Sequence, residues 1–384
     1  MLLINLIPLS IILFVTFQTT ACLDAGLSAY ELASYSVPYD CDLCDPKFNH
    51  FIIHKTTGDI YLGATNIIVH LNPSYHEIKI LSTFIECTND IDREDCINHN
   101  KLLTIYYGTD NEKLITCGNY NGGECQIRDP NDIDFSMQVD HRVAAPGNLS
   151  TVYTIAPAPD STSNGVGEML YIGATDPDFQ EIAFFSRQRL SDASILSIPN
   201  DNGLILGTTN FLVDFKDVFD FNGFTYFVTH QRFDKSGQNQ DNQYPNILSK
   251  ISRVCHESTD VDTWAEVVIE CTHNGENYNL IQAVHLTTVG SDLAGSLGLP
   301  TNEQVLIGLF AKSVDPTDIK ADNRSALCIF RLNDIEFKFL RAIAACLESS
   351  DGANGATYIT GHSCTTVSSN LSSLANDRIK NQES

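Results

Sequence analysis

The residue types that could hold a metal ion gather near the N-terminus. Cys41 and Cys44 form a C-x-x-C pair, and His50 and His54 follow it. Thiolates and imidazole nitrogens are zinc ligands, but the gap between Cys44 and His50 is short for a zinc finger. A redox role needs a βαβ setting, which the strand-rich neighbourhood does not offer. We therefore expect no zinc and no redox cofactor here, and the pairing of Cys41, Cys44 and Cys22 stays open.

A second cluster, "DIDREDC" from Asp90 to Cys96, carries enough carboxylates to suggest calcium. An EF-hand loop needs Gly at its sixth position and Glu at its twelfth. This chain has Asp95 and Lys101 at those positions. The pattern therefore indicates a solvated acidic loop, and we expect no metal site in it.

The sequence also lacks the patterns of common catalytic sites. The sequence contains no S-x-D-x-G-x-x-W box, no G-x-S-x-G elbow, no H-E-x-x-H and no glycine-rich phosphate loop. Glycosidase chemistry needs two carboxyl groups facing each other across a cleft, whereas the pattern places the acidic residues in turns between strands. We expect no enzymatic activity and no cofactor, with a glycosidase as the weaker alternative.

The overall composition bounds the partners. The chain has 384 residues, a formal net charge of −25, 43% hydrophobic residues and 18% charged residues. It can build a large core, so it is not a disordered protein. An acidic surface repels nucleic acid and anionic membranes and attracts basic partners. The same charge is also compatible with a role in solubility alone.

The first residues are typical of a secretory signal peptide at 1–21. Leu2 to Phe17 is mostly apolar, and Thr19-x-Ala21 fits a cleavage site, although no basic residue precedes Lys47. A retained anchor is too short, and a lipoprotein site at Cys22 is a minor alternative. No later window reaches 18 apolar residues. We expect the mature chain to be extracellular, which agrees with its twelve cysteines.

Three sequons are compatible with this secretory route. Each has the form Asn-x-Ser or Asn-x-Thr, and they begin at Asn148, Asn323 and Asn370. We expect all three to be candidate glycosylation sites.

The elements that would position these residues show a repeat. "IYLGAT" begins at Ile60 and "LYIGAT" at Leu170, and related stretches begin at Leu114, Thr225 and Val305. The steps between successive stretches are 54, 56, 55 and 80 residues. Around each stretch lie short apolar or alternating runs separated by turn residues, among them Asn222-Gly223, a hairpin signal. Four-stranded sheets repeated at a fixed period predict an all-β fold, a β-propeller. We expect equivalent inner strands at Tyr61, Ile115, Tyr171, Tyr226 and Leu306.

Two further segments differ from this pattern. "GSDLAGSLGLP", from Gly290 to Pro300, predicts one short helix with Ser291 as its N-cap and Gly-Leu-Pro as its stop. The residues from Thr365 onward are rich in Ser and Asn without periodicity, which predicts a disordered tail over 365–384.

A set of motifs resembles the sema domain of plexins in order and spacing, from about Phe48 to Cys364. The motifs are "KLITCGNYNGGECQIRD", "NLSTVYTIAPAP", "FKDVFDFNGFTYFVTHQ", "LSKISRVC" and "RSALCIFRLNDIEFKF". The C-G-x-x-x-x-G-x-C-Q pattern from Cys117 to Gln126 is shared with the scatter-factor receptor kinases. Plexin sema domains are seven-bladed propellers that bind semaphorins outside the cell. The resemblance therefore implies the recognition head of a semaphorin receptor in cell-guidance signalling such as axon guidance, with no catalytic residues.

Two features bear on cysteine pairing, the spacing of the cysteines and the resemblance to plexin sema domains. Spacing alone favours local disulfides Cys87–Cys96 and Cys117–Cys125, each closing a short polar loop and contributing roughly 2–3 kcal/mol. The resemblance implies the same two pairs and adds Cys271–Cys328 and Cys346–Cys364. It would pair Cys255 with a cysteine beyond Cys364, so Cys255 is a candidate for an unpaired thiol.

The expected domain division follows from these observations. A signal peptide over 1–21 and an N-terminal segment over 22–47 precede a sema domain over 48–364, and the tail over 365–384 follows. The length of the sema region suffices for about five of the seven blades of the family, so we expect a part of a longer receptor that is secreted as written. A secreted decoy that binds ligand without signalling is the alternative, and a propeller-fold glycosidase is a weaker one. Contact residues for the ligand carry no short motif and are not assigned.

Overall fold

The structure is a computed structural model that describes eleven stretches of the chain. They are residues 35–36, 47–83, 97–108, 112–119, 123–147, 149–157, 167–175, 185–190, 213–232, 246–256 and 264–348. Within them the chain forms five antiparallel sheets of three or four strands, a two-stranded ribbon and two helices. The all-β expectation is therefore confirmed.

The first two sheets have four strands each, joined in chain order. Sheet 1 contains β1 (Phe48–Ile53), β2 (Ile60–Ala64), β3 (Ile67–Leu71) and β4 (Glu77–Ser82). Sheet 2 contains β5 (Asn100–Tyr107), β6 (Glu112–Gly118), β7 (Glu124–Asp129) and β8 (Asp132–Arg142).

The remaining sheets follow the same plan. Sheet 3 contains β9 (Thr151–Pro157), β10 (Glu168–Ala174) and β11 (Phe185–Leu190). Sheet 4 contains β12 (Val213–Phe221), β13 (Phe224–Arg232), β14 (Ile247–Cys255) and β15 (Ala265–Val268). Sheet 5 contains β18 (Leu280–Thr288), β19 (Gln304–Ser313) and β20 (Ala321–Arg331), and the ribbon contains β16 (Cys271–His273) and β17 (Glu276–Tyr278).

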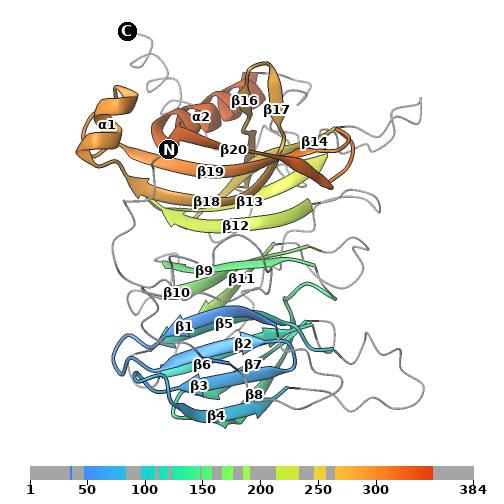
Figure 1. Cartoon of the computed structure of the whole chain (residues 1–384), viewed down its shortest axis with the longest axis vertical. Helices are drawn as coiled ribbons and strands as arrows, with labels where there is room; N and C mark the ends of the chain where they lie inside the picture. Colours follow the sequence, from blue (N-terminus) through green and yellow to red (C-terminus); the bar gives the residue numbers. More distant parts are fainter. Residues whose placement is uncertain are drawn as a thin grey trace, which may run out of the picture.

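The sheets succeed one another along the long axis of the molecule (Figure 1). Sheets 1 and 2 lie at one end, sheet 3 lies in the middle, and sheets 4 and 5 lie at the other end. The first strands of successive sheets contact one another, β1 with β5, β5 with β9, β9 with β12 and β12 with β18. Successive sheets therefore contact each other through their first strands.

The repeated stretches occupy equivalent places. Each lies in the second strand of its sheet, and these strands are β2, β6, β10, β13 and β19. They are not the innermost strands, however, because it is the first strands that meet between sheets. The second strand has neighbouring strands on both sides, and every residue of β2 is buried. This constant environment explains why the repeat is most visible in the second strands.

The glycine of the repeat leaves room for the next sheet. We call the face of a sheet that meets the following sheet its forward face. A Cβ on Gly63 would lie 2.3 Å from Oδ1 of Asn100 in sheet 2. A Cβ on Gly173 would lie 2.4 Å from the ring of Phe215 in sheet 4. The "GAT" sequence therefore marks contacts between sheets.

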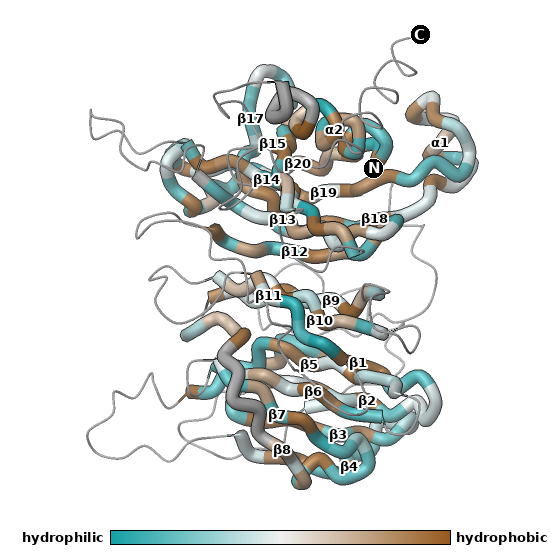
Figure 2. Tube along the Cα trace, turned by 180° about the vertical axis from the view of Figure 1, so that it is seen from behind, coloured by the Kyte–Doolittle hydropathy of each residue, from teal (hydrophilic) through white to brown (hydrophobic). Residues whose placement is uncertain are grey.

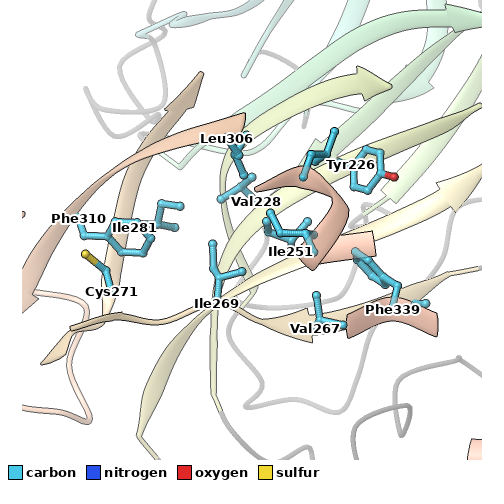
Figure 3. Packing of buried hydrophobic residues seen from close by; sticks show 13 residues of the cluster. Tyr226, Val228, Ile251, Val267, Ile269, Cys271, Ile281, Leu306, Phe310 and Phe339 are labelled. Atoms are coloured by element: carbon cyan, nitrogen blue, oxygen red, sulfur yellow. The ribbon is translucent and has the colours of Figure 1, made fainter. Parts of the chain in front are cut away.

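Four of the five matched positions point forward. Tyr61, Ile115, Tyr171 and Tyr226 each pack with residues of the following sheet. Leu306 instead packs with Tyr226 and Val228 of the preceding sheet 4 (Figure 3). The match of "VLIGLF" to the repeat is thus wrong in register, because a shift of one residue along a strand reverses the face of every side chain. Ile307 points forward in sheet 5.

The short helix α1 (Ser291–Leu297) is confirmed, but Ser291 is not its N-cap. Gly290 occupies that position without a side-chain cap bond, and Ser291 is the first helical residue. Gly298 ends the helix with a φ of 66°, a left-handed conformation that glycine adopts without steric cost. The tight turn between β12 and β13 is also as predicted, with positive φ at Asn222 and Gly223.

A second helix, α2 (Leu332–Glu348), was not predicted. It contacts β15, β19 and β20, so it packs against the outermost described strand of sheet 4 and against sheet 5. Among the side chains of α2 that the structure describes, Leu332, Ile335 and Phe339 are buried, spaced three and four apart as on one face of a helix. That spacing was a signal in the sequence that could have revealed the helix. In Figure 3 Phe339 lies beside Ile251 and Val267 in the largest of the hydrophobic clusters.

Candidate recognition surface

The histidines that suggested zinc belong to the junction of sheets 1 and 2. His54 is buried, and its Nε2 lies 2.9 Å from Oε2 of Glu112. Its Nδ1 accepts hydrogen bonds from the backbone N–H groups of Thr56 and Thr57. Both nitrogens are thus engaged within the fold. His50 lies on β1 beside Asn49, whereas Cys41 and Cys44 fall outside the described residues. Within the described residues, no group of three potential ligands is placed to hold a metal. The Asp90–Cys96 loop is also outside the described residues.

The acidic residues do not lie only in turns, which corrects the sequence-based interpretation. Asp214, Asp217 and Glu266 lie within strands of sheet 4 and are largely shielded from solvent. Glu266 accepts hydrogen bonds from Gln231 at 3.0 Å and from the indole of Trp264 at 3.0 Å. These buried carboxylates are satisfied by protein donors, so they serve the joining of strands.

Asp214 links sheet 4 to the segment that leads into sheet 3, and through His230 the connection continues to sheet 5. Its Oδ1 accepts a hydrogen bond from Ser150 of the segment that leads into sheet 3, and its Oδ2 lies 2.7 Å from Lys216 and 3.5 Å from His230. His230 Nε2 donates in turn to the carbonyl of Ile281 in sheet 5. Burial alone would raise the pKa of Asp214, but His230 and Lys216 outweigh it and lower the pKa to about 2.

Two of the expected disulfides are present. Cys117–Cys125 joins paired positions of β6 and β7, and Cys271–Cys328 ties the ribbon to β20. The pair Cys87–Cys96 and the side chains of Cys346 and Cys364 lie outside the described residues. Cys255 ends β14 and is half-buried.

An exposed apolar and acidic surface lies on the outer strands of sheets 1 and 2. We define this outer rim as Ile78 and Lys79 of β4 with Asp134, Phe135 and Met137 of β8. The side chains of Phe135 and Met137 are 69% and 56% exposed, and Ile78 is 51% exposed. Phe135 and Met137 are two residues apart in one strand, so they project from the same face.

An ion pair joins the two strands of the outer rim. Lys79 Nζ lies 2.5 Å from Asp134 Oδ2, and both groups are about half exposed. Asp129, Asp132 and Glu77 lie close by along the same strands and turns. Solvent-exposed aromatic and methionine side chains amid carboxylates are suited to protein recognition, because they offer area to bury and a charge that attracts basic groups. In the sequence, the spacing of Phe135 and Met137 places them on one face of a strand, but nothing local marks that face as exposed.

The sequon asparagines can be placed in part. Asn323 is exposed on β20, whereas Asn148 and Asn370 fall outside the described residues. The hydropathy of the trace places apolar stretches along the strands and hydrophilic residues mainly at the turns (Figure 2). Neither helix in the described part of the chain has both the length and the apolar character needed to cross a membrane.

The succession of antiparallel sheets defines a class of protein, an all-β propeller of the sema type. Among solved structures, the chain superimposes on the Plexin A4 full extracellular region with a TM-score of 0.65 and 24% identity, over 79% of this chain and 36% of the other. This similarity supports the fold. The number of blades stays a prediction.

Comparison of sequences leads to the same proteins. The chain is 27% identical to Plexin-A4 of Homo sapiens over 337 residues, 78% of this chain. It is 26% identical to Plexin-A3 of Mus musculus over 345 residues, 79% of this chain. The chain spans 17% and 18% of the length of these two relatives. No family profile matches the chain. The resemblance to plexins inferred from the sequence is confirmed by these comparisons.

Proposed function

We propose that this chain is an extracellular recognition domain that binds a semaphorin-type protein ligand. The observation that carries the proposal is the combined similarity to plexins in sequence, over 78% of the chain, and in fold. Two disulfides within the described residues fit an oxidising compartment. A signal peptide over 1–21 and a sema domain over 48–364 are parts of this proposal. In it the chain has no enzymatic activity.

We place the ligand contact at the outer rim. Its exposed Phe135 and Met137 supply the apolar area that an interface centre requires. The rigid sheets behind them are held by buried contacts, so binding there would order few additional groups. The net charge of −25 favours a ligand surface with lysine and arginine around an apolar centre.

The test is a binding assay of the secreted protein, captured on a surface, against a panel of semaphorins at physiological salt. Circular dichroism and a cooperative thermal transition would first establish that the captured protein is folded. We expect saturable binding of at least one semaphorin, weakened as salt rises because exposed charges are screened. Silence across the panel from folded protein would contradict the proposal.

The place of the contact is tested separately with Phe135→Ser combined with Met137→Ser. Both side chains are exposed, so we expect the stability of the double variant to equal that of the wild type, whereas its dissociation rate rises at least tenfold. Leu297→Ser is the matched control, since Leu297 is 44% exposed on the distant helix α1. Binding that is lost in the control and kept in the double variant would place the contact elsewhere.

A soluble decoy that binds the ligand without signalling is the alternative within the same class. It shares the ligand and the contact surface with a receptor head. A receptor is distinguished from it by a membrane-proximal continuation of the reading frame.

A further inference from the structure

Four of the first strands contain one extra residue at an equivalent position. In sheet 2 the register passes from Asn100 to Leu102 within one step of β6, so that Lys101 bulges out of the ladder. The corresponding residues are Asn49 of β1, Lys216 of β12 and Gln282 of β18. A bulge redirects a side chain and often lies next to a functional site. All four of these residues are polar, so the first strands present polar groups at matching places.

Two of these bulges carry a lysine, and the surroundings of the two lysines differ. Lys216 Nζ lies 2.7 Å from Oδ2 of Asp214, which stands two residues earlier in β12. The residue two positions before Lys101 is His99, so an imidazole takes the place of this carboxylate in sheet 2. Lys101 Nζ donates instead to the backbone carbonyl of Leu149 at 2.6 Å. Among the described residues, no carboxylate forms an ion pair with Lys101.

The ammonium group of Lys101 is also buried. The residue is only 7% exposed. An ammonium group carries three N–H donors, and the Leu149 carbonyl is the one acceptor that the described part of the chain gives it. A buried charge is costly unless it is paired, because it has lost the water that stabilised it. Burial accordingly lowers the pKa of Lys101 to about 8. The surroundings of Lys101 therefore lack a negative partner.

Two histidines near Lys101 add further nitrogen donors. His50 lies on β1, and its ring centroid is 5.9 Å from that of Tyr153 on β9, so side chains of sheets 1, 2 and 3 meet here. Burial lowers the pKa of His50 and of His99, and the charge of Lys101 adds to this effect on both. Lys47 acts on His99 in the same direction. In a chain with a net charge of −25, this cluster is a local concentration of basic groups.

We propose that Lys101, His99 and His50 bind a small oxyanion such as sulfate or phosphate where the first strands of sheets 1, 2 and 3 meet. The ion supplies the acceptors that the ammonium lacks and takes the part that Asp214 plays for Lys216. An oxyanion has several acceptor oxygens, so it accepts hydrogen bonds from the ammonium and from an imidazole at once. Because Lys101 is nearly fully buried, the site suits a small ion and excludes a charged polymer. The inference does not depend on the semaphorin-type ligand.

The test is equilibrium dialysis of the full chain with radiolabelled sulfate, at an ionic strength held constant with sodium chloride. We expect one saturable site in the wild type, shown to be folded by circular dichroism. Lys101→Met keeps the length of the side chain and removes its charge, so its affinity should fall about tenfold or more. Lys216→Met, at the equivalent bulge of sheet 4, is the matched control and should keep the affinity. A wild type without a saturable site, or equal affinity in Lys101→Met, would overturn the proposal.

Thermal unfolding separates an ion site from a lysine with a purely structural role. Without sulfate, Lys101→Met should be at least as stable as the wild type, because the change removes an unpaired buried charge. Millimolar sulfate should raise the unfolding midpoint of the wild type and leave that of Lys101→Met unchanged, since only a folded protein with the site gains from the ion. A Lys101→Met protein that is destabilised equally with and without sulfate would assign Lys101 to the Leu149 carbonyl alone and overturn the proposal.

The pH dependence of sulfate binding gives a further readout. A bound anion favours the charged forms of Lys101 and of both histidines, so the affinity should rise as the pH falls. At pH 9 only about a tenth of Lys101 is charged, given its pKa of about 8, and binding should be about tenfold weaker than at pH 7. Lys47 also faces the cluster, and Tyr153 stays neutral because burial raises its pKa to about 12.

A double variant, His50→Gln with His99→Gln, identifies the part of the histidines. It should lose the rise in sulfate affinity below pH 7 and keep the fall toward pH 9. Sulfate affinity of the wild type that is equal at pH 6, 7 and 9 would overturn the proposal. A double variant with the wild-type profile would overturn the assignment of His50 and His99 to the site.

Discussion

The junction between sheets 1 and 2 and the junction between sheets 4 and 5 are built in different ways. The first is close-fitting and partly polar: Asn100 lies against Gly63, the N–H of Asn98 donates to Oδ1 of Asn66, and Tyr61 donates to the carbonyl of Pro130. The second is broad and apolar, and α2 completes it with Phe339. A fold can thus join similar sheets either by shape and hydrogen bonds or by apolar volume.

The two junctions should fail for opposite reasons. Added volume should disturb the first, because its side chains already meet a glycine at close range. Lost volume should disturb the second, because a cavity there leaves many apolar neighbours without contacts.

The largest effect is expected from Phe339→Ala in the junction of sheets 4 and 5. Phe339 is fully buried, and truncation of such a residue costs about 3–5 kcal/mol of the free energy of unfolding. Phe337→Ala on the same helix is the control; this ring is only half-buried and lies under Arg341 at 4.6 Å. Denaturant titration of both variants should show a clearly smaller loss for the control. Equal losses would mean that α2 is not held by its buried face.

The opposite change is expected to disturb the junction of sheets 1 and 2. Gly63→Ala places a methyl group 2.3 Å from Oδ1 of buried Asn100, and overpacking of this kind costs about 1–3 kcal/mol. Gly295→Ala is the matched control in helix α1, where nothing lies within 4 Å of the added carbon. This control should gain up to about 1 kcal/mol, because alanine is the better helix former. Thermal unfolding of both variants decides, and a Gly63→Ala protein as stable as the wild type would contradict the close fit.

Asp214 provides a third kind of connection, which is charged and joins sheet 4 to sheet 3. Its pKa is lowered to about 2 in the folded state, so the carboxylate stabilises the fold above its ordinary pKa, and this stability is lost as the pH falls from about 4 to 2. The loss amounts to about 2 kcal/mol. Asp214→Asn should unfold more easily at pH 7 and show a weaker loss of stability over this acid range. Parallel pH profiles of the two proteins would contradict the assignment.

Much of the architecture could be predicted from the sequence, for a physical reason. The second strands β2 and β10 are buried almost throughout, so Tyr61 and Tyr171 are both buried on the forward face and their segments share a pattern. The first strands vary because they meet different neighbours. Leu306 shows the limit of this approach, since a similar string of letters can lie one residue out of register.

The helix and the recognition surface were harder to predict. Phe339 belongs to a family motif, and only the three-and-four spacing of Leu332, Ile335 and Phe339 in the sequence indicates that this motif runs on into a helix. The outer rim arises because β4 and β8, which are far apart in the chain, lie side by side through Lys79 and Asp134. Such a surface depends on tertiary packing, and no local pattern encodes it. The burial of Asp214 is not encoded locally either, because two of its partners, Ser150 and His230, come from other parts of the chain.

Hydrogen exchange of the protein with and without a semaphorin from the panel tests the central claim most directly. The account predicts that amides of β8 around Phe135 exchange more slowly in the complex, whereas those of β18 to β20 are unchanged. The same experiment on the Phe135→Ser, Met137→Ser variant should show no such protection at equal ligand concentration. Absence of binding by the folded protein, or protection confined to sheet 5, would contradict the claim that this chain recognises a semaphorin-type ligand through the outer rim of its first two sheets.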